Sequence, residues 1–92
     1  MRYINSVAII RTRKENTVGC HMVVAKKYMQ LMSSQFAYKD CYICNDFEIL
    51  ENAGGDIIIK THDSLQYAGI EFENTIRIRN VTDIEIMSEH EF

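Results

Sequence analysis

The sequence contains no proline in 92 residues, although an average usage of about 5% would give roughly four or five. This absence excludes a proline-rich linker and favours continuous secondary structure. No apolar stretch approaches the roughly 18 residues of a membrane-spanning helix. The short apolar run of residues 7–10 follows only Arg2 and is too short for the core of a signal peptide. These absences predict a cytoplasmic protein that has no contact with membranes.

Cysteine is scarce and odd in number, with three residues in the chain. Without a secretory signal, we expect reduced thiols and no disulfide framework. Cys41 and Cys44 have the two-residue spacing that lets two thiolates reach one zinc ion, and Cys20, His21 and His62 are the candidates for further ligands. The second ligand pair of a structural zinc site is missing, so thiols packed in a strand are the favoured interpretation. We therefore expect no cofactor, with a zinc-stabilised domain as an alternative.

The totals predict one globular domain over residues 1–92. Hydrophobic residues make up 47% of the chain and charged residues 25%, which is typical of a folded rather than a disordered chain. A chain of this length buries a modest share of its surface, so a homodimer interface would add useful stabilisation. The net charge of −3 is uneven: most cations lie in residues 1–40 and most acids in residues 41–92.

Residues 75–87 predict a β-hairpin. Isoleucines alternate with charged residues in both halves, which is the period of two that gives a strand one apolar and one wet face. A loop at residues 80–82 places opposite charges on one face and isoleucines on the other. The expected pairs are Arg79 with Asp83, Arg77 with Glu85, Ile78 with Ile84, and Ile76 with Ile86.

A second hairpin is predicted over residues 47–61, around the turn sequence of residues 52–56. Gly55 is expected at the left-handed turn position that glycine adopts at little cost. Both faces of this hairpin keep apolar residues, so we expect each face to be covered. The expected pairs are Glu48 with Lys60, Ile49 with Ile59, and Leu50 with Ile58.

The remaining elements complete an α+β prediction. Residues 3–12 read as an N-terminal strand, with residues 7–10 apolar on both faces, and residues 18–23 read as a returning strand. Apolar side chains of residues 24–37 fall in an arc of roughly 160° on a helical wheel, which predicts one amphipathic helix. We expect this helix to pack on a mostly antiparallel sheet. A small all-β barrel with a helical insertion is the alternative, and residues 64–74 fit helix, strand or loop.

The sequence offers no coherent catalytic constellation. In His62-Asp63-Ser64 a base, a carboxylate and a hydroxyl are adjacent, but adjacent side chains of an extended segment point to opposite faces. Catalytic triads are assembled in space from separate elements. We therefore expect a protein without enzymatic activity.

The first functional hypothesis is a small regulatory or inhibitory protein that acts by binding another protein, as a homodimer. It is motivated by the small core, the apolar residues on both hairpin faces and the opposite charges of the two halves. An acidic surface can engage a basic groove on a partner. The candidate interaction residues are Leu50, Ile58, Glu71, Glu73, Asp83 and Glu85.

The alternative hypothesis is a nucleic-acid-binding protein that uses its basic N-terminal half. Cations beside aromatic residues can hold a phosphate backbone and stack bases. Five cations are few for a chain that is acidic overall. The candidate contact residues are Arg11, Arg13, Lys14, Lys26 and Lys27.

Overall fold

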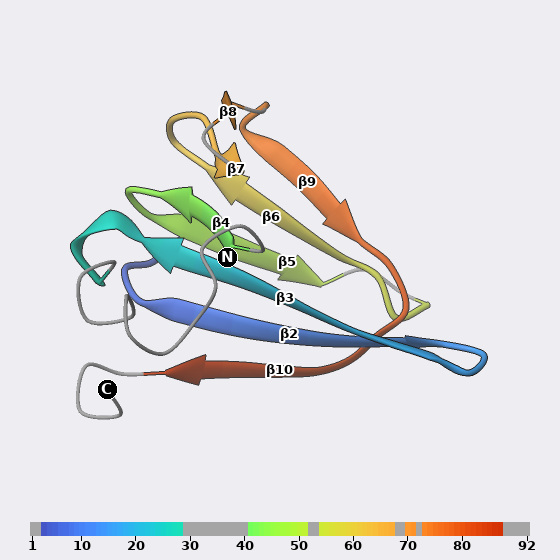
Figure 1. Ribbon diagram of the computed structural model, residues 1–92. Coiled ribbons are helices and arrows are strands. Elements are labelled where there is room, and N and C mark those ends of the chain that lie inside the picture. Colours follow the sequence, from blue (N-terminus) through green and yellow to red (C-terminus); the bar gives the residue numbers. More distant parts are fainter. Residues whose placement is uncertain (1–2, 29–40, 52–53, 68–69, 72, 88–92) are drawn as a thin grey trace.

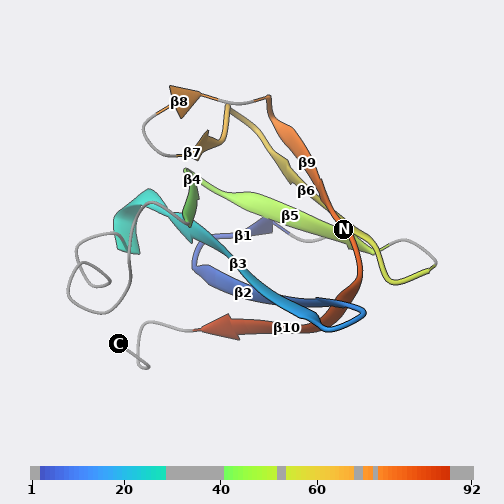
Figure 2. The same cartoon turned by 45° about the vertical axis from the view of Figure 1, so that its right-hand side comes forward.

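The computed structural model describes residues 3–28, 41–51, 54–67, 70–71 and 73–87. Strands account for 71% of these residues and form two sheets, seen as separate layers in Figures 1 and 2. Sheet A has the order β1 (Tyr3–Ile4), β5 (Phe47–Glu51), β6 (Ile57–Thr61) and β9 (Thr75–Ile78). Sheet B has the order β10 (Val81–Met87), β2 (Val7–Lys14), β3 (Thr17–Ala25), β4 (Cys41–Cys44), β7 (Gln66–Tyr67) and β8 (Ile70–Glu71).

The main core lies between the two sheets. It is built from aliphatic and aromatic side chains of both layers: Ile4, Ala8, Ile10, Val23, Cys44, Phe47, Ile57, Ile59, Leu65 and Ile78. A second buried cluster lies on the outer face of sheet B and contains Val7, Ile9, Met22, Val24, Ala25, Tyr28 and Cys41. Sheet B is therefore covered on both faces in its centre, which explains the uninterrupted apolar runs of its strands.

The predicted N-terminal strand is divided between the sheets. Residues 5–6 form a bend, after which β1 belongs to sheet A and β2 to sheet B. The Ser6 carbonyl accepts a 3.0 Å hydrogen bond from the Ala25 amide, which fixes the bend beside β3. Residues 7–10 are all buried, and β2 lies between β10 and β3. The prediction of a central strand with two covered faces is confirmed.

The predicted helix of residues 24–37 is wrong where the structure can test it. Val24 and Ala25 end β3, and a single 3₁₀ turn, η1 (Lys26–Tyr28), follows; residues 29–37 lie outside the described residues. Val24 pairs with Val7 on one side and, in parallel, with Ile43 on the other. A strand covered on both faces buries the same consecutive apolar residues that suggested a helical stripe, so periodicity could not separate the two.

The fold class is therefore nearly all β rather than α+β. No α-helix occurs within the described ranges, and the two sheets do not close into a barrel. The alternative of a small barrel with a helical insertion is also wrong. None of the helical segments in the described part of the chain has the length and hydropathy that crossing a membrane requires.

The predicted hairpin of residues 75–87 is replaced by a corner between the sheets. β9 pairs with β6 in sheet A, and β10 pairs with β2 in sheet B. Asn80 turns the chain with a positive φ of 60°, a conformation that asparagine adopts more readily than most residues. The Asn80 carbonyl accepts a 2.9 Å hydrogen bond from the Arg13 amide, and the Val81 amide donates a 2.7 Å bond to the Gly55 carbonyl.

Burial explains why the corner replaces the hairpin. Ile76 and Ile78 of β9 pair with Ile59 and Ile57 of β6. Ile84 of β10 pairs with Ile10 of β2. These isoleucines reach the core between two sheets, whereas an isolated two-stranded ribbon is at best marginally stable. The alternation was assigned correctly and the strand partners were not.

The second predicted hairpin is confirmed in its register. β5 and β6 pair Glu48 with Lys60, Ile49 with Ile59 and Leu50 with Ile58. Gly54 and Gly55 both adopt positive φ, at 91° and 83°. Glycine is the residue that adopts this conformation without strain. Residues 64–74 contain two short paired strands, β7 and β8.

Candidate functional site

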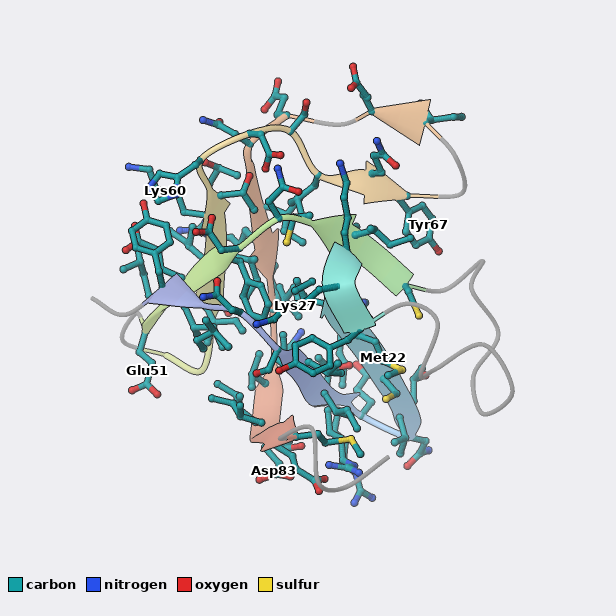
Figure 3. All side chains as sticks on the ribbon, turned by 90° about the vertical axis from the view of Figure 1, so that its left-hand side faces the viewer. Met22, Lys27, Glu51, Lys60, Tyr67 and Asp83 are labelled. Atoms are coloured by element: carbon teal, nitrogen blue, oxygen red, sulfur yellow. The ribbon has the colours of Figure 1, made fainter. Side chains whose placement is uncertain are left out.

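The five predicted nucleic-acid contacts do not form one patch. Arg11, Arg13 and Lys14 lie on β2 and lead into the β2–β3 turn, whereas Lys26 and Lys27 follow the other end of β3. A strand of this length separates the two groups by roughly 25 Å at the usual rise per residue. Lys27 belongs to η1 and is labelled in Figure 3; its Nζ lies 5.2 Å from the centre of the Tyr28 ring.

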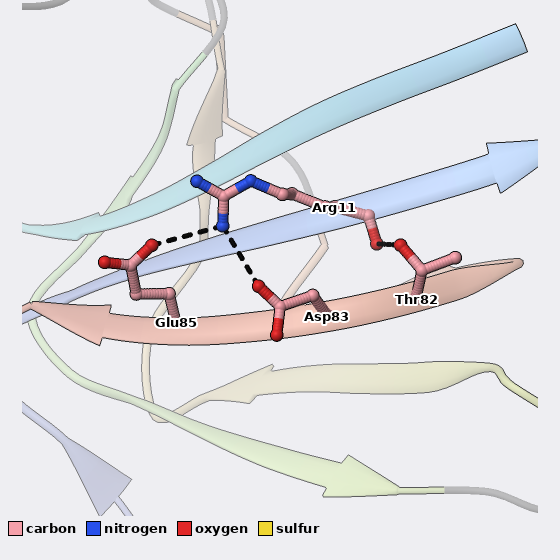
Figure 4. A network of polar contacts seen from close by, with 4 residues as sticks. All are labelled: Arg11, Thr82, Asp83 and Glu85. Carbon is pink, nitrogen blue, oxygen red and sulfur yellow. Dashed lines mark hydrogen bonds and ion pairs between the residues drawn. The ribbon is translucent and has the colours of Figure 1, made fainter.

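Arg11 is instead part of an ion-pair network with β10. Its Nη1 lies 3.1 Å from Asp83 Oδ2 and 3.1 Å from Glu85 Oε2, and its carbonyl accepts a 3.3 Å hydrogen bond from the Thr82 hydroxyl (Figure 4). The hydrogen bond to Glu85, with the nearby charges of both carboxylates, raises the pKa of the Arg11 guanidinium. The single positive charge of Arg11 pairs with two negative charges, those of Asp83 and Glu85. The β10 edge of sheet B therefore keeps a net negative charge at this network.

The six predicted protein-contact residues occupy three places. Leu50 and Ile58 pair on the outer face of sheet A and are half-buried. Glu71 lies on β8 at the far edge of sheet B, and Glu73 follows it in the chain; both are exposed. The remaining two, Asp83 and Glu85, lie on β10 at the opposite edge of that sheet.

The cysteines also separate. Cys41 packs in the outer cluster of sheet B and Cys44 in the core between the sheets, because residues three apart in a strand point to opposite faces. Cys20 is exposed. The described residues contain no group of three or more His, Cys, Asp or Glu side chains that could hold a metal ion, including around His62.

Burial controls the chemistry of Cys44. Desolvation raises the pKa of its thiol to about 12, and the carboxylates of Asp63 and Asp46 add to this effect. A thiol with so high a pKa remains protonated near neutral pH and is a poor nucleophile and metal ligand.

A polar cluster that the sequence did not predict lies at the ends of β4 and β6. His62 Nδ1 lies 3.0 Å from Asp46 Oδ1, and the imidazole stacks on the Tyr3 ring with centroids 4.0 Å apart. Beside this pair, Asn45 donates a hydrogen bond to Asp63.

A groove between the two sheets lies beside β10, and we call it the β10 groove. It consists of two adjoining hollows of about 390 and 310 Å³ that share Glu51 and Ile84. Its floor is aliphatic and comes from both sheets: Ile4, Ile49, Ile57, Val81, Ile84 and Ile86. Glu51 and Asp56 also line it.

One wall of this groove is an edge strand. β10 pairs with β2 on one side and, in the described part of the chain, with no strand on the other. Ile86, at the mouth of the groove, is 43% exposed. Apart from the Val81 amide, which donates a hydrogen bond to the Gly55 carbonyl, this edge of β10 has no strand partner among the described residues. It lies beside an exposed aliphatic surface, and strand addition uses these two features.

Sequence reasoning named Asp83 and Glu85 as candidate interaction residues, which stays a prediction, and it did not predict the groove. The alternation of residues 81–87 predicted the strand correctly. The groove arises because Ile4 and Ile49 of sheet A approach Ile84 and Ile86 of sheet B, and no local pattern encodes that approach.

Comparisons of the chain with protein-family models, with curated proteins and with solved structures found no match.

Proposed function

We propose that this chain is a non-enzymatic protein-binding module that docks an extended segment of a polypeptide along β10. The observation that carries the proposal is the β10 groove, in which an aliphatic floor lies beside a strand edge that no described strand pairs with. In β-strand addition, main-chain hydrogen bonds provide affinity and pockets for alternate side chains provide specificity.

The shape of the site supports an extended ligand. β10 runs for seven residues, which is long enough to pair with a strand of typical length. Alternate side chains of a docked strand would enter the groove over Ile84 and Ile86, where their burial is favourable at about 25 cal/mol per Å².

The lining also indicates which side chains such a segment carries. Asp83 and Glu85 lie with Arg11 on the outer face of sheet B, and Glu51 and Asp56 line the groove. A segment with basic residues at the outward positions and apolar residues at the inward positions would complement both faces, since opposite charges across strands are favourable.

A peptide-display experiment tests this proposal and requires no identified partner. Random ten-residue peptides are selected on the immobilised chain, and the enriched peptides are titrated against variants. We expect Ile86→Lys to weaken their binding at least about tenfold, because a lysine at a strand edge opposes pairing.

Val18→Lys is the matched control, because Val18 is 72% exposed and lies at the β2–β3 tip, away from the groove. It should bind the peptides like the wild type. Enriched peptides that bind Ile86→Lys and wild type equally would contradict the assignment to β10, and a failure to enrich any peptide would contradict strand addition.

A further inference from the structure

β9 has the side-chain pattern that the β10 edge fits. It is an edge strand of sheet A, paired only with β6 among the described strands. Ile76 and Ile78 point toward the core, and Arg77, between them, points outward and is exposed, with its Nε 4.0 Å from Asp56 Oδ2. Arg79 follows the strand, is exposed and has no ion-pair partner among the described residues.

β10 presents the complementary pattern at its own free edge, the side on which no described strand pairs with it. Ile84 and Ile86 point toward the groove, and Asp83 and Glu85 point outward with exposed fractions of 59% and 50% for their side chains. Arg11 neutralises one of these two charges, so the edge can accept a further cation.

Within one chain these two strands cannot pair, because the corner at Asn80 sends them into different sheets. Two copies of the chain have no such restriction. We propose that β9 of a second copy pairs antiparallel with the free edge of β10, and this inference rests on the proposed strand addition at β10. The pairs are Arg79 with Asp83, Arg77 with Glu85, Ile78 with Ile84, and Ile76 with Ile86.

Charge selects this contact over the symmetric ones. A two-fold β10–β10 contact keeps the same face of both strands together, so every register centred between residues 83 and 85 sets at least one acid opposite an acid of the other copy. A β9–β9 contact likewise sets arginines opposite each other. Like charges directly opposite are unfavourable and opposite charges favourable, so of these three contacts the β9–β10 contact is the one that is complementary on both faces.

The contact also covers the mouth of the groove. Ile76 and Ile78 of the second copy lie next to Ile86 and Ile84, whose exposed surface is thereby reduced. Because each copy offers β9 to one neighbour and β10 to another, the contact is head-to-tail and generates a ring or a chain.

Charge reversal at one cross-strand pair tests the inference. Sedimentation velocity of the full chain is measured over a concentration series for the wild type, Arg79→Glu, Asp83→Arg and the double variant. We expect each single change to weaken self-association about five- to tenfold, since an attractive cross-strand pair becomes repulsive. The double variant, or a mixture of the two single variants, should restore association to within about threefold of the wild type.

Three outcomes would overturn the inference. A wild-type chain that stays monomeric at millimolar concentration excludes the contact, while peptides selected on β10 would still support the proposed function. Single changes that the double variant does not rescue would exclude the register. Under a β10–β10 contact in which Asp83 faces Glu85, Asp83→Arg alone would strengthen association, because the new arginine would face that glutamate of the other copy. Thermal melting of each variant establishes that the fold is retained.

Discussion

At the scale of single residues, position within a sheet decides chemistry more than residue type does. Cys41 and Cys44 are near neighbours in the chain, yet they point into different apolar clusters. Arg11 resembles a phosphate contact in the sequence, yet both of its acidic partners lie on β10, more than seventy residues along the chain. A side chain's partners depend on which strand lies beside it and which face it occupies.

The raised pKa of Cys44 predicts a loss of stability at alkaline pH. In the unfolded chain the thiol ionises near its ordinary value of 9.0, whereas in the fold it keeps its proton up to about 12. Between these values the unfolded state binds fewer protons, so the free energy of unfolding falls as pH rises, by about 1.4 kcal/mol per pH unit for one group. Below pH 9 the contribution is constant.

Chemical denaturation of Cys44→Ala from pH 8 to 11 measures this effect. The variant should lose stability less steeply than the wild type above pH 9, whatever its stability at pH 8. Cys20→Ala is the control, because Cys20 is exposed, and it should keep the wild-type slope. Desolvation also raises the pKa values of Tyr3 and Tyr42. Their effect on the pH dependence of stability is the same in the wild type, Cys44→Ala and Cys20→Ala. An unchanged slope in Cys44→Ala would contradict the prediction.

At the scale of elements, the β9–β10 corner is the feature that creates the candidate site. Because of this corner, β10 does not pair with β9 in a hairpin. It forms the edge of sheet B instead, where Ile84 and Ile86 line the groove. The corner depends on the left-handed backbone of Asn80 and on the hydrogen bonds that anchor it to Arg13 and Gly55.

Substitution of Asn80 should test this corner directly. Asn80→Val should destabilise the fold by about 1–2 kcal/mol, because a β-branched residue is strained at positive φ. Asn80→Gly should change stability by much less, because glycine adopts positive φ without strain. Urea denaturation compares the two variants, and equal stability of valine and glycine at this position would contradict the left-handed corner.

At the scale of the whole molecule, non-local pairing dominates. β2 pairs with β10 from the other end of the chain, and β1 pairs with β5. The core between the sheets collects side chains from residues 4 to 78. Folds of this kind close long loops before their contacts form, and they fold more slowly than helical proteins of similar size.

Refolding kinetics should show a main phase of milliseconds to seconds without a proline-limited phase. Topology sets the first expectation. The second follows because the chain contains no proline, whose isomerisation takes tens to hundreds of seconds. Stopped-flow fluorescence of the tyrosines, followed by manual mixing, covers both ranges. A phase of tens of seconds that does not depend on protein concentration would contradict the prediction, whereas a concentration-dependent one would report association.

The sequence by itself determined the local structure that depends on neighbouring residues. Alternation located β9 and β10, the apolar run of residues 7–10 identified a central strand, and the glycines at 54–55 set the register of β5 with β6. In each case the feature depends on a turn sequence or on a period of two, and both extend over only a few residues.

Tertiary structure alone decided which strands pair and which surfaces remain open. Residues 75–87 satisfy a hairpin by charge and hydrophobicity, but pairing β9 with β6 and β10 with β2 buries the same isoleucines between two sheets. Likewise, Val24 and Ala25 belong to a strand that is covered on both faces. Their apolar side chains were therefore mistaken for the apolar stripe of a helix. The β10 groove depends on this long-range choice, because burial is gained from side chains that are distant in the chain and no local pattern records it.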